Sequence, residues 1–161
     1  YSIMIVNEKL TSFNGGIEAQ DVWNIESLDR VPHSFSMHIK MSVFFNASHQ
    51  VEYKPGQFGE MHRHSYQLTA TAVYQNSSDR NYYVPFEDFR NILNQIAKHY
   101  EGHCLNDIPV FQHMPSTTEN FVQLIALQLE QLTRYLPLFV REISLNESPT
   151  IGVTLVAENG R

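Results

Sequence analysis

Apolar and polar residues alternate in two neighbouring stretches of the chain. The apolar residues fall on every second position between residues 35 and 53, and again between residues 61 and 74. A period of two places such residues on one face of a β-strand. Lys54-Pro55-Gly56 interrupts the alternation, and a turn cluster follows at residues 76–81. We therefore expect the two strands to pair as a long antiparallel hairpin.

The spacing of apolar residues then changes to three and four, which is typical of amphipathic helices. One such stretch covers residues 86–100. A second helix, ending near Tyr135, is predicted to begin at Ser116-Thr117-Thr118-Glu119. This segment fits a capping box, with Ser116 at the N-cap and Glu119 three residues later.

Two further alternating stretches, residues 140–146 and 151–157, flank a turn at Ser148-Pro149. The order strand, strand, helix, helix, strand, strand predicts an α+β fold, a four-stranded antiparallel sheet with both helices on one face. The open edges of such a sheet must be covered or paired with another chain. Residues 1–34 show no clear period beyond a possible strand over Tyr1–Val6, so we interpret them as an N-terminal extension of a domain at residues 35–161.

Composition narrows the class of protein. The chain has 161 residues, 42% of them hydrophobic, which fits one globular domain. Its net charge of −6 argues against nucleic-acid binding. No apolar run is long enough to span a membrane. The single cysteine rules out a disulfide framework within the chain and is compatible with a cytoplasmic location, which we expect.

Three histidines form a candidate metal site. His62 and His64 lie two residues apart at the start of a predicted strand, so their rings project to the same side. His49 lies late in the preceding strand, on its apolar face. A hairpin would bring the three rings to one end, and three histidines with an open fourth position are typical of a catalytic zinc. For any single pair of histidines, the alternative to a zinc site is a structural role on the surface or in the core. The third histidine, on the neighbouring strand, favours the zinc site.

Two segments resemble the 6-pyruvoyl-tetrahydropterin synthase and 6-carboxytetrahydropterin synthase family: Phe45-Asn46-Ala47-Ser48-His49 and Met61-His62-Arg63-His64-Ser65-Tyr66. Further similar segments follow in order at residues 105–109, 116–120 and 142–147. The resemblance implies the tunnelling fold, in which subunits join edge strands into an oligomeric β-barrel, commonly a hexamer of two stacked trimers. It also implies Zn²⁺ on His49, His62 and His64, and a pterin-like substrate at a subunit junction.

The same resemblance assigns residues to substrate binding. Glu147 would bind the guanidine-like edge of the pterin with both carboxylate oxygens, and Thr117, Thr118 and Glu119 would line the pocket. Two alternatives stay open. Ser116 and Glu119 already have a complete role as a helix cap, worth about 1 kcal/mol. Glu147 also fits an ordinary carboxylate near a turn.

The sequence departs from the family at the positions of the residues that transfer protons in the family's enzymes. The position of the family's thiol is occupied by Phe58, and the nearest carboxylate is Glu60, which fits a base, a group beside the metal or an exposed loop residue. The family's Asp-His relay aligns with Glu101 and Gly102. Either His103, one residue later, takes the relay role, or the relay is absent.

These features lead to three functional hypotheses. The first is a divergent zinc-dependent carbon–oxygen or carbon–carbon lyase acting on a substrate like dihydroneopterin triphosphate, with Glu60, Glu101 and His103 moving protons. The second is an enzyme that keeps the metal but has changed its reaction or substrate. The third is a non-catalytic, ring-forming scaffold or ligand-binding module that retains zinc. A homo-oligomer, either a trimer or a hexamer, is expected in each case.

Overall fold

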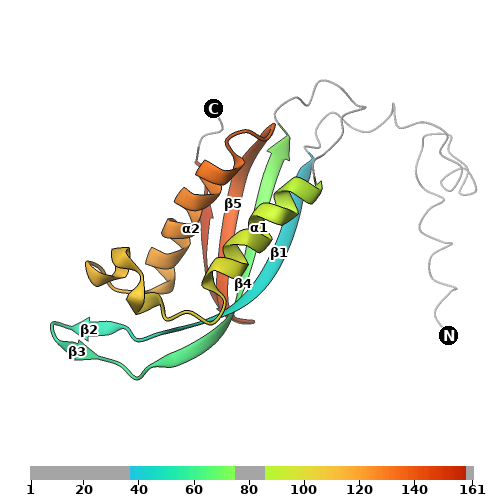
Figure 1. Cartoon of the computed structure of the whole chain (residues 1–161). Helices are drawn as coiled ribbons and strands as arrows, with labels where there is room; N and C mark the ends of the chain where they lie inside the picture. The colour runs from blue at the N-terminus through green and yellow to red at the C-terminus, as the bar shows by residue number, and fades with distance from the viewer. Residues whose placement is uncertain (1–36, 75–85, 159–161) are drawn as a thin grey trace, which may run out of the picture. The chain divides into compact units, whose positions relative to one another are not determined.

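The computed structural model describes residues 37–74 and 86–158 (Figure 1). The predicted domain boundary at residue 34, the strand over Tyr1–Val6 and the turn at residues 76–81 lie outside these residues. The elements, in chain order, are β1 (His38–His49), β2 (Glu52–Lys54), β3 (Gln57–Phe58), β4 (His62–Tyr74), α1 (Phe86–Tyr100), η2 (Leu105–Asp107), η3 (Pro109–Gln112), α2 (Thr118–Thr133), β5 (Leu138–Ser148) and β6 (Ile151–Val156).

The main sheet has the strand order β1-β4-β5-β6, and all neighbouring strands are antiparallel. Helices α1 and α2 lie side by side across one face of this sheet (Figure 1). The predicted α+β arrangement, with both helices on one face, is therefore confirmed. Strands β1 and β6 form the two edges of the sheet in the described part of the chain.

The first predicted strand is shorter in the structure than the alternation suggested. It ends at His49, because Asn106 binds the next residue in place of a neighbouring strand. The Asn106 Oδ1 atom accepts from the Gln50 N–H at 2.9 Å, and Asn106 Nδ2 donates to the Gln50 carbonyl at 2.9 Å. The chain then forms the separate β2–β3 hairpin, whose turn contains Gly56 with a φ of 72°. This left-handed backbone conformation favours glycine.

The core lies between the helices and the sheet, and its centre is aromatic. The α1 boundaries match the prediction, and every apolar residue on its predicted face is buried except Phe86, which is 50% exposed. From α2, Phe121 is fully buried and meets four rings edge to face, those of Phe45, Tyr66, Tyr100 and Phe111. Such aromatic pairs stabilise the fold beyond the burial of their area.

The predicted cap of the second helix is wrong by one residue. The N-cap of α2 is Thr117, whose hydroxyl accepts from the Asn120 N–H at 3.3 Å. Ser116 is buried, and its hydroxyl donates instead to the Gln50 carbonyl at 3.2 Å. The tertiary contact with the end of β1 therefore takes Ser116 out of the cap and moves the helix start to Thr118.

The opposite face of the sheet is largely polar, and no helix of residues 37–74 or 86–158 covers it. A row of hydroxyls crosses all four strands on this face, with 2.7 Å between Ser42 Oγ and Thr69 Oγ1 and 2.8 Å between Ser144 Oγ and Thr154 Oγ1. Thr69 and Ser144 are paired in the register between the central strands, which makes the row continuous. This face suits contact with water better than a second apolar layer.

Replacing Phe121 with alanine is predicted to lower the free energy of unfolding by about 3–5 kcal/mol, because it opens a cavity among four aromatic rings. Chemical denaturation measures this change. Phe44→Ala is the matched control, since Phe44 is 65% exposed on the uncovered face and its loss should cost less than about 1 kcal/mol. Equal costs for the two substitutions would contradict the placement of the core.

Candidate metal centre and substrate pocket

The pairing of β1 with β4 brings the three histidines together. His49 is the last residue of β1 and lies opposite His62, the first residue of β4. His64 follows two positions later, so its ring projects to the same side as that of His62. One ligand atom from each ring lies within 4.8 Å of the others, and the ring centroids are 4.5–5.1 Å apart. The predicted meeting of the three rings is confirmed.

Backbone carbonyls orient two of these rings. The Nδ1 atom of His49 lies 2.5 Å from the Ser116 carbonyl oxygen, and that of His62 lies 2.8 Å from the Glu60 carbonyl oxygen. Because a carbonyl oxygen only accepts, each Nδ1 carries a proton, and in a neutral ring this leaves the lone pair on Nε2. Burial, with a further contribution from the neighbouring imidazoles, lowers the pKa of His49 and favours its neutral, metal-binding form.

The inward nitrogens fit a bound cation. The Nε2 atoms of His49 and His64 are buried and have no hydrogen-bond partner among the residues that the structure describes. Leaving a buried polar atom unsatisfied costs about 1–3 kcal/mol, so such atoms in a native protein call for a partner. Three neutral imidazoles are a donor set that binds zinc and related transition metals and leaves one coordination position open.

A carboxylate and a hydroxyl lie beside this triad. Glu147, near the end of β5, places Oε2 4.0 Å from His64 Nε2 and accepts a hydrogen bond from Thr118 Oγ1 at 2.7 Å. The buried Tyr66 ring packs 5.5 Å from the His64 ring, and its hydroxyl lies beside the Thr118 side chain. Burial, followed by the charge of Glu147, raises the pKa of the Tyr66 phenol, so it stays protonated.

The other predicted pocket residues lie on or before the first turn of α2. The Thr117 hydroxyl serves as the helix cap, as described above, and Glu119 is exposed. Two groups of the candidate site were not predicted from the sequence. They are the Ser116 carbonyl, which contacts His49, and the Tyr66 phenol, whose ring packs on His64. Tyr66 could have been found, because it continues the alternation of His62 and His64 on the same face of β4.

The three residues predicted to move protons have different surroundings. Glu60 is exposed next to the start of β4. His103 is also exposed, with Nδ1 3.1 Å from the Glu101 carbonyl oxygen. The Glu101 carboxylate accepts from Asn46, at 2.8 Å from the backbone N–H and 3.2 Å from Nδ2. Their catalytic roles stay predictions.

Phe58 lies on β3, where it is 50% exposed. It lines a cavity of about 410 Å³ with Phe111, Met114 and other residues of the segment before α2. This cavity borders Gln50 and Ser116, and none of the three histidines lines it. Phe58 therefore adds apolar surface to a cavity that is separate from the three histidines.

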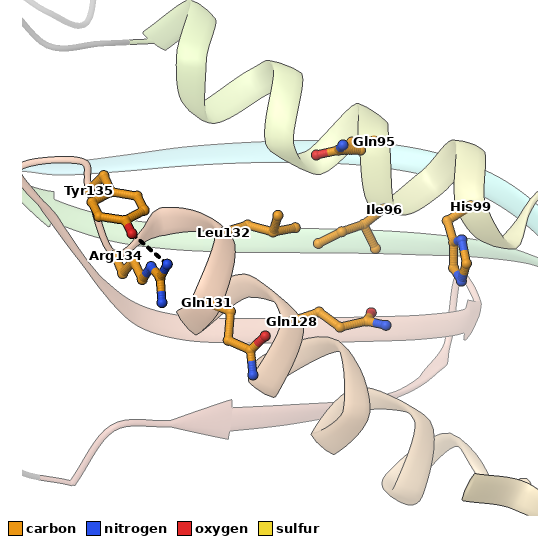
Figure 2. Close-up of a pocket in the computed structure, with 8 residues that line it drawn as sticks. All are labelled: Gln95, Ile96, His99, Gln128, Gln131, Leu132, Arg134 and Tyr135. Carbon is orange, nitrogen blue, oxygen red and sulfur yellow. Dashed lines mark hydrogen bonds between the residues drawn. The ribbon is translucent and has the colours of Figure 1, made fainter. Parts of the chain in front are cut away.

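Figure 2 shows a second hollow, a groove of about 590 Å³ between α1 and α2. Ile96 and Leu132 point toward each other from the two helices, and Arg134 and Tyr135 are hydrogen-bonded at one end. None of the predicted site residues lines this groove. The candidate site therefore lies at the end of the sheet rather than between the helices.

A family model described as 6-pyruvoyl tetrahydropterin synthase matches residues 38–158. The chain belongs to this family, and its sheet with two helices is the family's tunnelling fold. No curated protein matches the chain in sequence. No helix in the described residues is long and apolar enough to cross a membrane.

Solved structures show the same fold at low sequence identity. The 6-pyruvoyl tetrahydropterin synthase of Caenorhabditis elegans has a TM-score of 0.61 at 17% identity, over 77% of this chain and 99% of that one. An uncharacterised protein of Wolinella succinogenes has a TM-score of 0.60 at 13% identity, over 78% and 100%. A Plasmodium vivax 6-pyruvoyltetrahydropterin synthase, with a catalytic glutamate replaced by alanine, has a TM-score of 0.54 at 19% identity, over 74% and 97%.

The metal centre predicts that purified protein holds about one zinc ion per chain after dialysis, as measured by elemental analysis. His62→Ala should weaken zinc binding more than about 100-fold, because a ligand is lost outright. The control is His113→Ala, which removes an exposed histidine that is absent from the triad. Unchanged zinc content in the His62 variant would contradict the assignment.

Proposed function

We propose that the chain is a divergent zinc-dependent lyase of the pterin synthase type, acting on a pterin-type substrate such as dihydroneopterin triphosphate. The observation that carries this proposal is the set of three histidines beside Glu147, in which the Nε2 atoms of His49 and His64 are buried and have no hydrogen-bond partner in the described part of the chain. Membership of the synthase family supports the same chemistry.

His49, His62 and His64 would hold the metal through Nε2. When bound, zinc supplies a Lewis acid that polarises substrate hydroxyl and carbonyl oxygens and makes adjacent C–H bonds more acidic. The Ser116 and Glu60 carbonyls keep two of the rings in the required tautomer, which raises the basicity of the metal-facing nitrogens.

Glu147 would bind the guanidine-like edge of the pterin with its two carboxylate oxygens. Thr118 supports this role, because its hydroxyl bonds Oε2 and fixes the carboxylate beside the triad. The buried Tyr66 ring lowers the local dielectric, which strengthens a charge-assisted pair. Thr117 and Glu119 would line the pocket from the first turn of α2.

Of the three residues predicted to transfer protons, we propose this role for Glu60 and His103. Glu60 is exposed and lies two residues before His62, the first residue of the metal-binding strand, and a glutamate is named as catalytic in the Plasmodium vivax synthase. His103 keeps Nε2 free to hold a proton, since its bond to the Glu101 carbonyl uses Nδ1. The Glu101 carboxylate, in contrast, is already bonded to Asn46.

A second candidate is a non-catalytic, ring-forming scaffold or ligand-binding module that keeps the zinc. Gly102 favours it, because this position has a φ of 76° and the family's relay histidine would be strained there. Phe58 favours it as well, since a phenyl ring cannot hold or pass a proton.

The catalytic proposal predicts that zinc-loaded protein releases inorganic triphosphate from dihydroneopterin triphosphate. Glu147→Gln should raise KM about 10- to 100-fold, because it removes a charge-assisted bond worth about 1.5–3 kcal/mol. Glu142→Gln, on the same strand, is the matched control. A zinc-loaded protein that releases no triphosphate would exclude the standard synthase reaction and leave two hypotheses, an enzyme with a changed reaction or substrate and the non-catalytic scaffold.

We also propose that copies of the chain join edge strands into a trimeric or hexameric barrel in the cytoplasm. Strand β1, along the residues before Asn46, would pair with β6 of another copy, which would satisfy the free outward backbone groups of both strands. Light scattering coupled to size exclusion should give three or six times the mass of one chain. A stable monomer at micromolar concentration would contradict the barrel.

A further inference from the structure

The loop after α1 binds the outer edge of β1 directly beside the metal centre. The Glu101 carboxylate accepts two hydrogen bonds from Asn46, as given above. The Gly102 N–H donates to the Asn46 carbonyl at 2.7 Å, and the Ser48 N–H donates to the His103 carbonyl at 2.9 Å. We call these four hydrogen bonds the edge clasp.

The edge clasp bonds residues before the metal ligand His49, and a second contact bonds the residue after it. Asn106 binds both backbone groups of Gln50, so the edge is bonded on either side of His49. Gly102 makes the clasp geometrically possible through its φ of 76°. An added Cβ there would meet nothing within 4 Å, so the backbone conformation, and not lack of space, requires glycine.

We propose that Glu101 is a positioning residue, which holds the end of β1 so that His49 reaches the metal, and that it does not transfer protons. This inference rests on the proposed metal centre. Both carboxylate oxygens are already used by Asn46, which leaves Glu101 poorly placed to exchange a proton with a substrate. Arg63 Nη2, 3.9 Å from Oε1, adds a weak attraction at this exposed site.

The protonation state of Glu101 agrees with this role. Hydrogen bonds from the backbone and side chain of Asn46 lower the pKa of the Glu101 carboxyl. The carboxylate therefore stays ionised at neutral pH and acts as an acceptor. A group that moves protons needs a pKa close to the working pH.

The end of β1 influences the position of all three ligands. His49 is its last residue, and His62 and His64 lie on the part of β4 that pairs only with β1, because the described pairing with β5 begins at Gln67. Metal ligands must be held within about 0.5 Å of their productive geometry by the groups around them. The edge clasp supplies this support on the side of β1 that has no neighbouring strand.

The test compares Glu101→Ala and Glu101→Gln in the full chain, with Glu87→Ala as the control. Glu87 is another exposed acidic residue, in the first turn of α1, where its carboxylate lies 4.0 Å from Arg90. Co²⁺ replaces zinc as the probe, because its visible absorption reports both affinity and tetrahedral geometry. Amide hydrogen exchange of Asn46 and Ser48 is measured in the metal-free protein.

We expect Glu101→Ala to weaken Co²⁺ binding about 10- to 100-fold and to speed exchange at both amides. Glu101→Gln keeps an oxygen acceptor for the Asn46 N–H, so it should recover most of the affinity and the protection. Glu87→Ala should match the wild type in both measurements.

Wild-type affinity and exchange in Glu101→Ala would overturn the inference. So would equal loss of turnover in the Ala and Gln variants at unchanged Co²⁺ affinity, since that pattern marks a proton-transfer group. A wild type that binds no Co²⁺ would overturn the proposed function instead. In that case the exchange of Asn46 and Ser48 still decides whether Glu101 holds the strand end.

Discussion

The register between β1 and β4 is the constraint on which the rest of the structure depends. It places His49 opposite His62 at the one end of the sheet where the second strand also carries His64. Side chains alternate between faces, so a slip of one residue would turn His49 to the opposite face. The same register places Phe45 opposite Tyr66, and these two rings stack at a centroid distance of 5.5 Å. The pairing of β1 with β4 thus fixes both the packing of the core and the relative positions of the three histidines.

The site is assembled where several elements end. Strand β1 stops at His49, α2 begins just after Ser116, and β5 ends just after Glu147 (Figure 1). Backbone groups at such ends are not used by regular structure, so they are available to bind side chains. The Ser116 carbonyl, just before α2, binds His49 for this reason, whereas the Asn46 N–H is available to Glu101 because β1 is an edge strand of the described sheet. The chemistry therefore depends on tertiary contacts between element ends more than on any single motif.

The sequence predicted those parts of the fold and of the site that follow from the regular spacing of residues within one segment. Both helices, the four main strands and the meeting of His49 with His62 and His64 follow from spacings of two, three and four residues. The break after His49 was not predicted, because it depends on Asn106, 56 residues farther along the chain. The shift of the cap from Ser116 to Thr117 has a similar origin, since the end of β1 takes the Ser116 hydroxyl. The Glu101–Asn46 bonds span 55 residues and leave no periodic signal.

Membership of the family and the geometry of the site support different conclusions. Residues 38–158 belong to the 6-pyruvoyl tetrahydropterin synthase family, and three histidines that could hold a metal ion lie together beside Glu147. X-ray absorption spectroscopy of the zinc-loaded protein tests the central claim most directly. The account predicts three imidazole nitrogens at about 2.0–2.1 Å and one further light atom. A zinc ion bound by sulfur, or by fewer than three imidazoles, would contradict it.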